Sequence, residues 1–179
     1  MPENSTDERL AHLQNAILRS FPDVVFDGPI THHDGEWPED IPENRIYEGQ
    51  VLYGDEMILY ENLKGHKWSD ISRQFIEGMA FDLVLLTSEA LVAFIAAWLM
   101  CSLENLKGKN DVRSDFIYMI TPAEDKDLMV NLLRAFKPEQ LAVLRLLLVE
   151  FSKSDSSDYV REHALNGIKF VGGLSTGRE

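Results

Sequence analysis

The densest set of metal-ligating side chains in the chain is the five-residue stretch His32-His33-Asp34-Gly35-Glu36. Imidazole nitrogens and carboxylate oxygens together bind zinc and other divalent ions. Two adjacent histidines followed by acids do not match a recognised ligand spacing, however, and a solvated polar loop has the same composition. We favour the loop and expect no bound metal or cofactor. His33 with Glu36 is the pair to test if a metal is found.

Acid–base or nucleophilic chemistry has three further candidate positions. Asp55 and Glu56 are paired carboxylates, but they stand at an expected helix start, where acids cap and stabilise a helix. Asp82 is either a buried, perturbed acid or the outward residue of an alternating apolar stretch. Cys101 would need a low pKa and a partner base to act as a nucleophile, whereas buried free cysteines are inert. The structural interpretation is favoured for each, so we predict no catalytic residue.

The negative charge of the chain is concentrated in its first third. Residues 1–61 hold 14 Asp and Glu against 3 Lys and Arg, a net charge of −11, out of −13 for the whole chain. Residues 62–179 hold 16 against 14, a net charge of −2. Nucleic acids and anionic membranes repel such a surface, which makes them poor partners. A basic protein would be attracted and steered towards it, although high charge also serves solubility alone.

Aromatic residues stand among these carboxylates, and such a composition is typical of a protein interface, where aromatic anchors lie inside a charged rim. The alternative is that the aromatic side chains pack the segment onto the core. The residues that we predict to bind a partner are Glu36, Trp37, Glu39, Asp40, Glu43, Tyr47, Glu48 and Tyr53.

Composition also predicts the compartment. One cysteine among 179 residues excludes an intramolecular disulfide. The first residues lack the basic and apolar regions of a secretory signal. The longest apolar run, Ala90 to Cys101, has 12 residues, whereas a membrane span needs about 20. We therefore expect a cytoplasmic protein.

Cap residues and apolar spacing of three and four predict most of the secondary structure. Thr87 is expected to cap the most apolar helix, and Pro138 to occupy the first position of another. Helices are expected at about 6–20, 55–63, from Ser69 onward, 88–105, 128–136, 138–151 and 158–168.

The predicted fold is mainly α: a single-domain bundle of five to seven helices around the apolar helix near residues 88–105. The domain would span residues 1–171 and include an irregular acidic segment at 22–54, rich in Pro and Gly. That region also has room for a small β element. Residues 172–179 are expected to form a flexible tail.

Several motifs together resemble an uncharacterised bacterial family of small helical proteins, a domain of unknown function. The resemblance covers about residues 10–152. It implies one helical domain and brings no activity or catalytic residue. The chain departs from the family pattern at Ser88 and Ala96, where members tend to have proline, and at Ala93, where they tend to have an aromatic residue. The motifs are Ser20-Phe21-Pro22, Asp55-Glu56, Trp68-Ser69-Asp70-Ile71, Leu85 to Leu91 with Phe94 and Trp98, and Phe136 to Gln140.

Three classes of function remain open. The first is a protein-binding module whose acidic residues 22–61 dock on a basic partner, as an immunity or antitoxin-like protein does by occlusion. The second is a metal-dependent enzyme that uses His32, His33, Asp34 and Glu36. The third is a structural or assembly subunit. We favour the first, because the charge is distributed so unevenly.

Overall fold

The computed structural model describes residues 6–31, 46–47, 50–51, 54–79, 82–104, 116–117, 120–121, 126–153 and 158–176. Seven α-helices lie in these residues, which confirms the mainly-α prediction. They are α1 (Thr6–Ser20), α2 (Gly54–Leu63), α3 (Arg73–Gly78), α4 (Ser88–Glu104), α6 (Lys126–Leu133), α7 (Pro138–Lys153) and α8 (Asp158–Thr176). Two 3-10 turns, η2 (Trp68–Asp70) and η3 (Asp82–Leu85), precede α3 and α4. A short antiparallel ladder joins β1 (Ile46–Tyr47) to β2 (Gln50–Val51).

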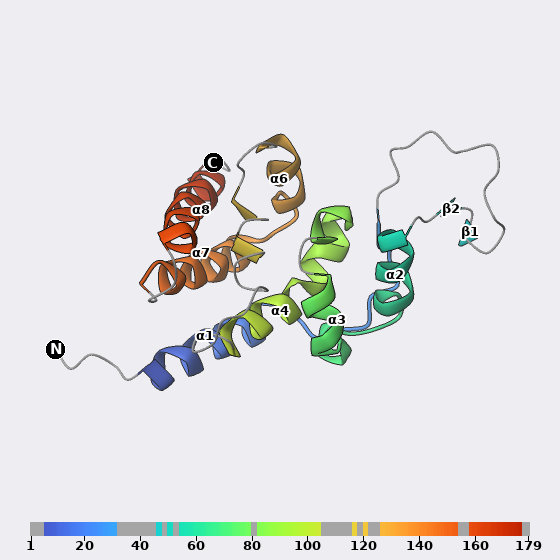
Figure 1. Cartoon of the computed structure of the whole chain (residues 1–179), viewed down its shortest axis with the longest axis horizontal. Coiled ribbons are helices and arrows are strands. Elements are labelled where there is room, and N and C mark those ends of the chain that lie inside the picture. Colours follow the sequence, from blue (N-terminus) through green and yellow to red (C-terminus); the bar gives the residue numbers. More distant parts are fainter. Residues whose placement is uncertain are drawn as a thin grey trace.

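Helix α4 lies at the centre of the molecule. Figure 1 shows α6, α7 and α8 towards one end, with α1 along α7 at that same end, α2 and α3 towards the other end, and α4 between them. Eleven of the 17 residues of α4 are buried, as its apolar composition predicted. The buried apolar side chains of all these helices form one hydrophobic cluster, in which Trp98 of α4 is fully buried.

The N-terminus of α4 is fixed by Thr87. Its hydroxyl oxygen accepts a hydrogen bond from the Ala90 amide at 3.1 Å, which confirms the predicted cap. The same hydroxyl donates to the Pro29 carbonyl at 2.7 Å, and the Thr87 amide donates to the Ile30 carbonyl at 2.9 Å. Thr87 therefore joins the start of the central helix to the segment that follows α1.

Helices α1 and α7 pack antiparallel. At one end the Gln140 side-chain amide, in the first turn of α7, donates to the carbonyl of Ser20 at 3.1 Å. At the other end Arg9 of α1 forms an ion pair with Glu150 of α7, with the two atoms 3.7 Å apart. Gln140 also accepts the amide hydrogen of Lys137 at 2.9 Å, so the residue before Pro138 has a partner and the helix begins where predicted.

The chain after α1 runs beside α2 and η2, as Figure 1 shows for the blue segment beside α2. The Trp68 indole donates to the Phe21 carbonyl at 3.2 Å, and the Phe26 amide donates to the His66 carbonyl at 3.0 Å. The Lys64 ammonium donates to the Asp27 carbonyl at 2.7 Å. These contacts hold residues 21–28 against the C-terminal end of α2.

The expected helix start at Ser69 was wrong. The Ser69 hydroxyl donates to the Asp23 carboxylate at 2.6 Å, and its amide donates to the same carboxylate at 3.1 Å. Ser69 therefore lies in the 3-10 turn η2, and α3 begins later, where Ser72 accepts the Phe75 amide hydrogen at 3.2 Å. A partner 46 positions away in the sequence decided which serine caps the helix.

The expected end of the last helix was also wrong. Helix α8 continues beyond Ile168 to Thr176, so the first five residues of the predicted tail are helical. Val171 is fully buried, and Leu174 packs against the core. These two residues continue the apolar stripe of Ala164 and Ile168 at spacings of three and four, and their burial offsets the low helix propensity of Gly172 and Gly173.

No helix among the described residues is both long and apolar enough to cross a membrane.

Candidate functional site

Most of the residues predicted to bind a partner lie outside the described residues. Tyr47 is described, in β1 opposite Gln50. The potential metal-binding stretch 32–36 also lies outside, and the part of the chain that the structure describes contains no group of three potential metal ligands. The other predicted partner-binding residues outside it are Glu36, Trp37, Glu39, Asp40, Glu43, Glu48 and Tyr53.

The described parts of the acidic region, residues 22–31 and 54–61, carry both exposed acids and exposed apolar side chains. Val24 and Val25 are 60% and 51% exposed, in a segment bounded by the exposed acids Asp23 and Asp27. Ile58 of α2 is also exposed. Val24 and Val25 are exposed because the Phe26 side chain packs against the core and its neighbours face outward. The exposed acids of α2 are Asp55 and Glu61.

Residues 65–68 form a packed turn. Gly65 has a φ of 74°, the left-handed conformation that glycine adopts readily at the end of a helix. Trp68 is buried and contributes its indole hydrogen to the Phe21 carbonyl. The His66 ring is exposed and its Nδ1 lies 3.0 Å from the carbonyl oxygen of Lys64. Trp68 is therefore structural.

Asp82 lies in the 3-10 turn η3 and not in an extended stretch, so the alternation expected there is absent. Leu83 is fully buried, while Asp82 is half-buried. Burial raises the pKa of the Asp82 carboxyl, and the negative charge of Asp55 raises it further. The charged form of Asp82 is therefore disfavoured in the folded protein.

Asp82→Asn is expected to stabilise the folded protein at pH 7. The pKa of Asp82 is higher in the folded protein than in the unfolded chain, so protonation of this side chain stabilises the folded protein. That stabilisation is fully present below about pH 3.9, the unfolded pKa, and is lost as the pH rises through the folded pKa. Asparagine imitates the protonated acid, and its advantage should shrink between pH 7 and pH 4. Urea unfolding at both pH values measures this, and destabilisation at pH 7 would contradict it.

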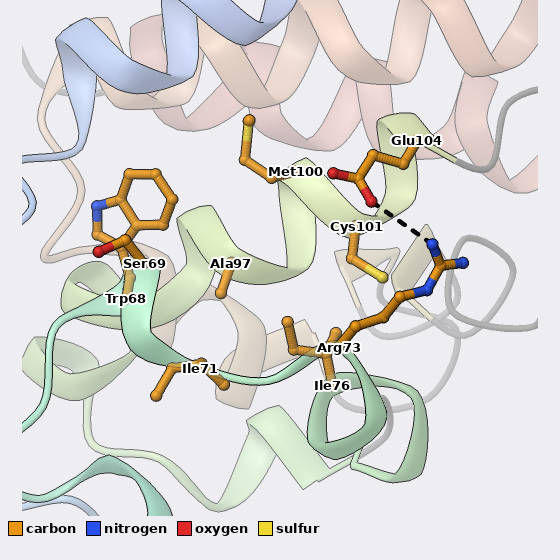
Figure 2. A pocket seen from close by; sticks show the side chains of 9 residues that line it. All are labelled: Trp68, Ser69, Ile71, Arg73, Ile76, Ala97, Met100, Cys101 and Glu104. Carbon is orange, nitrogen blue, oxygen red and sulfur yellow. Dashed lines mark ion pairs between the residues drawn. The ribbon is translucent and has the colours of Figure 1, made fainter.

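A pocket of about 230 Å³ lies between the η2–α3 segment and α4. Figure 2 shows the side chains that line it. The η2–α3 segment contributes Trp68, Ser69, Ile71, Arg73 and Ile76. Helix α4 contributes Ala97, Met100, Cys101 and Glu104, which share one face at helical spacing. The lining is therefore mainly apolar, with charges at one end.

Arg73 holds two carboxylates together at the charged end of this pocket. Its Nε donates to the Glu77 carboxylate at 2.7 Å, and its Nη1 lies 3.6 Å from the Glu104 carboxylate, as the dashed line in Figure 2 shows. All three side chains are about half exposed. The hydrogen bond from Arg73 to Glu77 raises the pKa of the arginine, which stays charged.

Cys101 has the properties of a packing residue. The side chain is 4% exposed, and burial raises the pKa of its thiol, although Arg73 acts in the opposite direction. A protonated thiol is a weak nucleophile. Cys101 is therefore a weak candidate for a nucleophile.

Sequence reasoning singled out Cys101 but missed the pocket around it. Ile71 and Ile76 come from a turn and a six-residue helix, and their approach to Ala97 is a result of tertiary packing. The spacing of Ala97, Cys101 and Glu104 by four and three was the available signal, because it places them on one helical face.

No family model matches the chain, and neither a curated protein nor a solved structure matches it. The resemblance to an uncharacterised helical family stays a prediction.

Proposed function

We propose that the protein is a binding module whose acidic region, residues 22–61, docks on a basic surface of another protein. One observation carries the proposal: this region holds 11 Asp and Glu and a single basic residue, Arg45, a net charge of −10 out of −13. Charge of one sign, gathered over a short segment, steers an oppositely charged partner and raises the rate of association.

The exposed valines support the same proposal. Interfaces combine apolar contacts with a polar rim, and Val24 and Val25 lie between the acids Asp23 and Asp27. The segment is held in place by the hydrogen bonds of Phe26 and by the contact of Asp23 with Ser69. A fixed segment loses little conformational entropy on binding, which favours affinity. An immunity or antitoxin-like protein that occludes a basic toxin is one form of such a module.

The triple variant Asp27→Asn, Asp55→Asn and Glu61→Gln is expected to bind the partner about tenfold more slowly than the natural chain. Each substitution removes one exposed carboxylate from the acidic region. The partner is captured from the native cells and identified by mass, and association rates are then measured with the purified pair. Raising the salt concentration from about 0.1 M to about 1 M shortens the Debye length from about 10 to about 3 Å. Association of the natural chain with its partner should therefore slow by a similar factor.

A matched control removes three exposed carboxylates elsewhere: Glu89→Gln in α4, Glu139→Gln in α7 and Glu162→Gln in α8. Glu89 and Glu139 lie in first helical turns, as Asp55 does, so the control loses at least as much helix stabilisation as the triple variant. The control should associate at nearly the natural rate. An association rate that salt leaves unchanged, or a control as slow as the triple variant, would remove the acidic region from the interface.

A further inference from the structure

The pocket beside α4 has the size and lining of a site for a small ring. Ile71, Ile76, Ala97 and Met100 supply apolar surface, and the Cys101 thiol lies among them (Figure 2). An apolar protein cavity of about 150 Å³ admits benzene. A volume of about 230 Å³ therefore accepts a six-membered ring with a short substituent. Sulfur atoms make favourable contacts with aromatic rings, and Met100 and Cys101 provide two of them.

The charged end of the pocket favours a cation. It presents the carboxylate of Glu104, and Glu77 lies next to it across Arg73. Arg73 is engaged by Glu77 at 2.7 Å, whereas its distance of 3.6 Å from Glu104 is too long for a hydrogen bond. A carboxylate accepts up to about four hydrogen bonds, so Glu104 can accept an ammonium group while Arg73 remains with Glu77.

We propose that this pocket binds a small aromatic amine, whose ring lies against Ala97, Met100 and Cys101 and whose ammonium group contacts Glu104. Among the described residues, two carboxylates and one guanidinium lie at this end, a net charge of −1 to which Glu77 contributes from beside the pocket, and the whole chain carries −13. An anionic ligand of the same shape would be repelled by the two carboxylates and attracted only by Arg73, which Glu77 already engages, and a neutral one lacks the ion pair. The proposal is independent of the protein partner, because the pocket uses no residue of the acidic region.

Methionine labelled with ¹³C in its methyl group gives a direct test, because Met100 lines the pocket. The chain has six methionines, and Met100→Leu identifies the signal of Met100. Phenethylamine should shift that signal with saturation at a dissociation constant of about 1 mM, the weak affinity of a small fragment. Phenethyl alcohol should bind more weakly, and phenylacetate weakest. Met129, which is buried in α6 and does not line the pocket, should not respond.

Two variants locate the ligand. Ala97→Leu fills the pocket and should abolish the shift, whereas Ala142→Leu, at an exposed position of α7, should not. Glu104→Gln, on a side chain that is 53% exposed, keeps the fold and should weaken phenethylamine about two- to fivefold, the size of an exposed ion pair, without weakening the alcohol. A Met100 signal that does not respond to phenethylamine, or phenylacetate binding as tightly as the amine, would overturn the proposal.

Discussion

Phe94→Ala is expected to lower the free energy of unfolding by about 3–5 kcal/mol, the largest effect of any substitution considered for this protein. Phe94 is fully buried in α4, and its ring meets that of Phe26 edge-on, with centroids 5.7 Å apart and planes 83° apart. Alanine removes the ring and leaves a cavity in a core that can relax only partially. Urea unfolding of the variant and the natural chain, followed by circular dichroism, measures the difference.

The destabilisation caused by Phe94→Ala should extend to residues 22–31 of the acidic region, because the Phe26 ring, which packs on Phe94, anchors them. Phe94→Leu keeps most of the volume and is expected to cost less than half as much. Leu165→Ala removes an apolar side chain that is 47% exposed and should change stability by no more than about 0.5 kcal/mol. If Phe94→Ala costs no more than Leu165→Ala, the central position of α4 is wrong.

Features that depend on neighbouring residues could be predicted from the sequence. The apolar composition of residues 90–101 indicated a central helix, and α4 is largely buried. Thr87 and Pro138 marked the helix starts correctly, because a cap needs a side chain near its own amides and a proline needs only its own ring geometry. Such signals are contained within one helical turn.

Features that depend on residues distant in the sequence could not be predicted from it. Ser69 and Ser72 are equally suited to cap a helix, and the contact of Ser69 with Asp23 excluded the first of them. The two glycines near the end of α8 indicated a tail, because their propensity is visible in the sequence and the burial of Val171 is not.

The two candidate sites also differ in how far the sequence could predict them. The concentration of charge in residues 22–61 is a property of composition and was visible at once. The exposure of Val24 and Val25 follows from which residue of that segment turns inward, and Phe26 does so because α4 presents Phe94. The pocket beside Cys101 requires two segments to meet, and no local pattern specifies their distance.

Thr87→Val is expected to lower the free energy of unfolding by about 2–3 kcal/mol, although it changes the volume of the side chain very little. The Thr87 hydroxyl has two partners, the Ala90 amide at 3.1 Å and the Pro29 carbonyl at 2.7 Å, and valine can serve neither. Loss of a helix cap costs about 1–2 kcal/mol, and loss of the hydrogen bond to the partly buried Pro29 carbonyl adds about 1 kcal/mol. Urea unfolding measures the sum.

Thr87→Ser separates the hydroxyl from the methyl group of the side chain. Serine can make both hydrogen bonds, so this variant should retain most of the stability that valine loses. The backbone hydrogen bond from residue 87 to Ile30 is present in every variant, so any difference between serine and valine belongs to the hydroxyl. Hydrogen exchange at Ala90 should quicken in the valine variant alone. Equal stability of the two variants would show that the hydroxyl does not join α4 to residues 29–31.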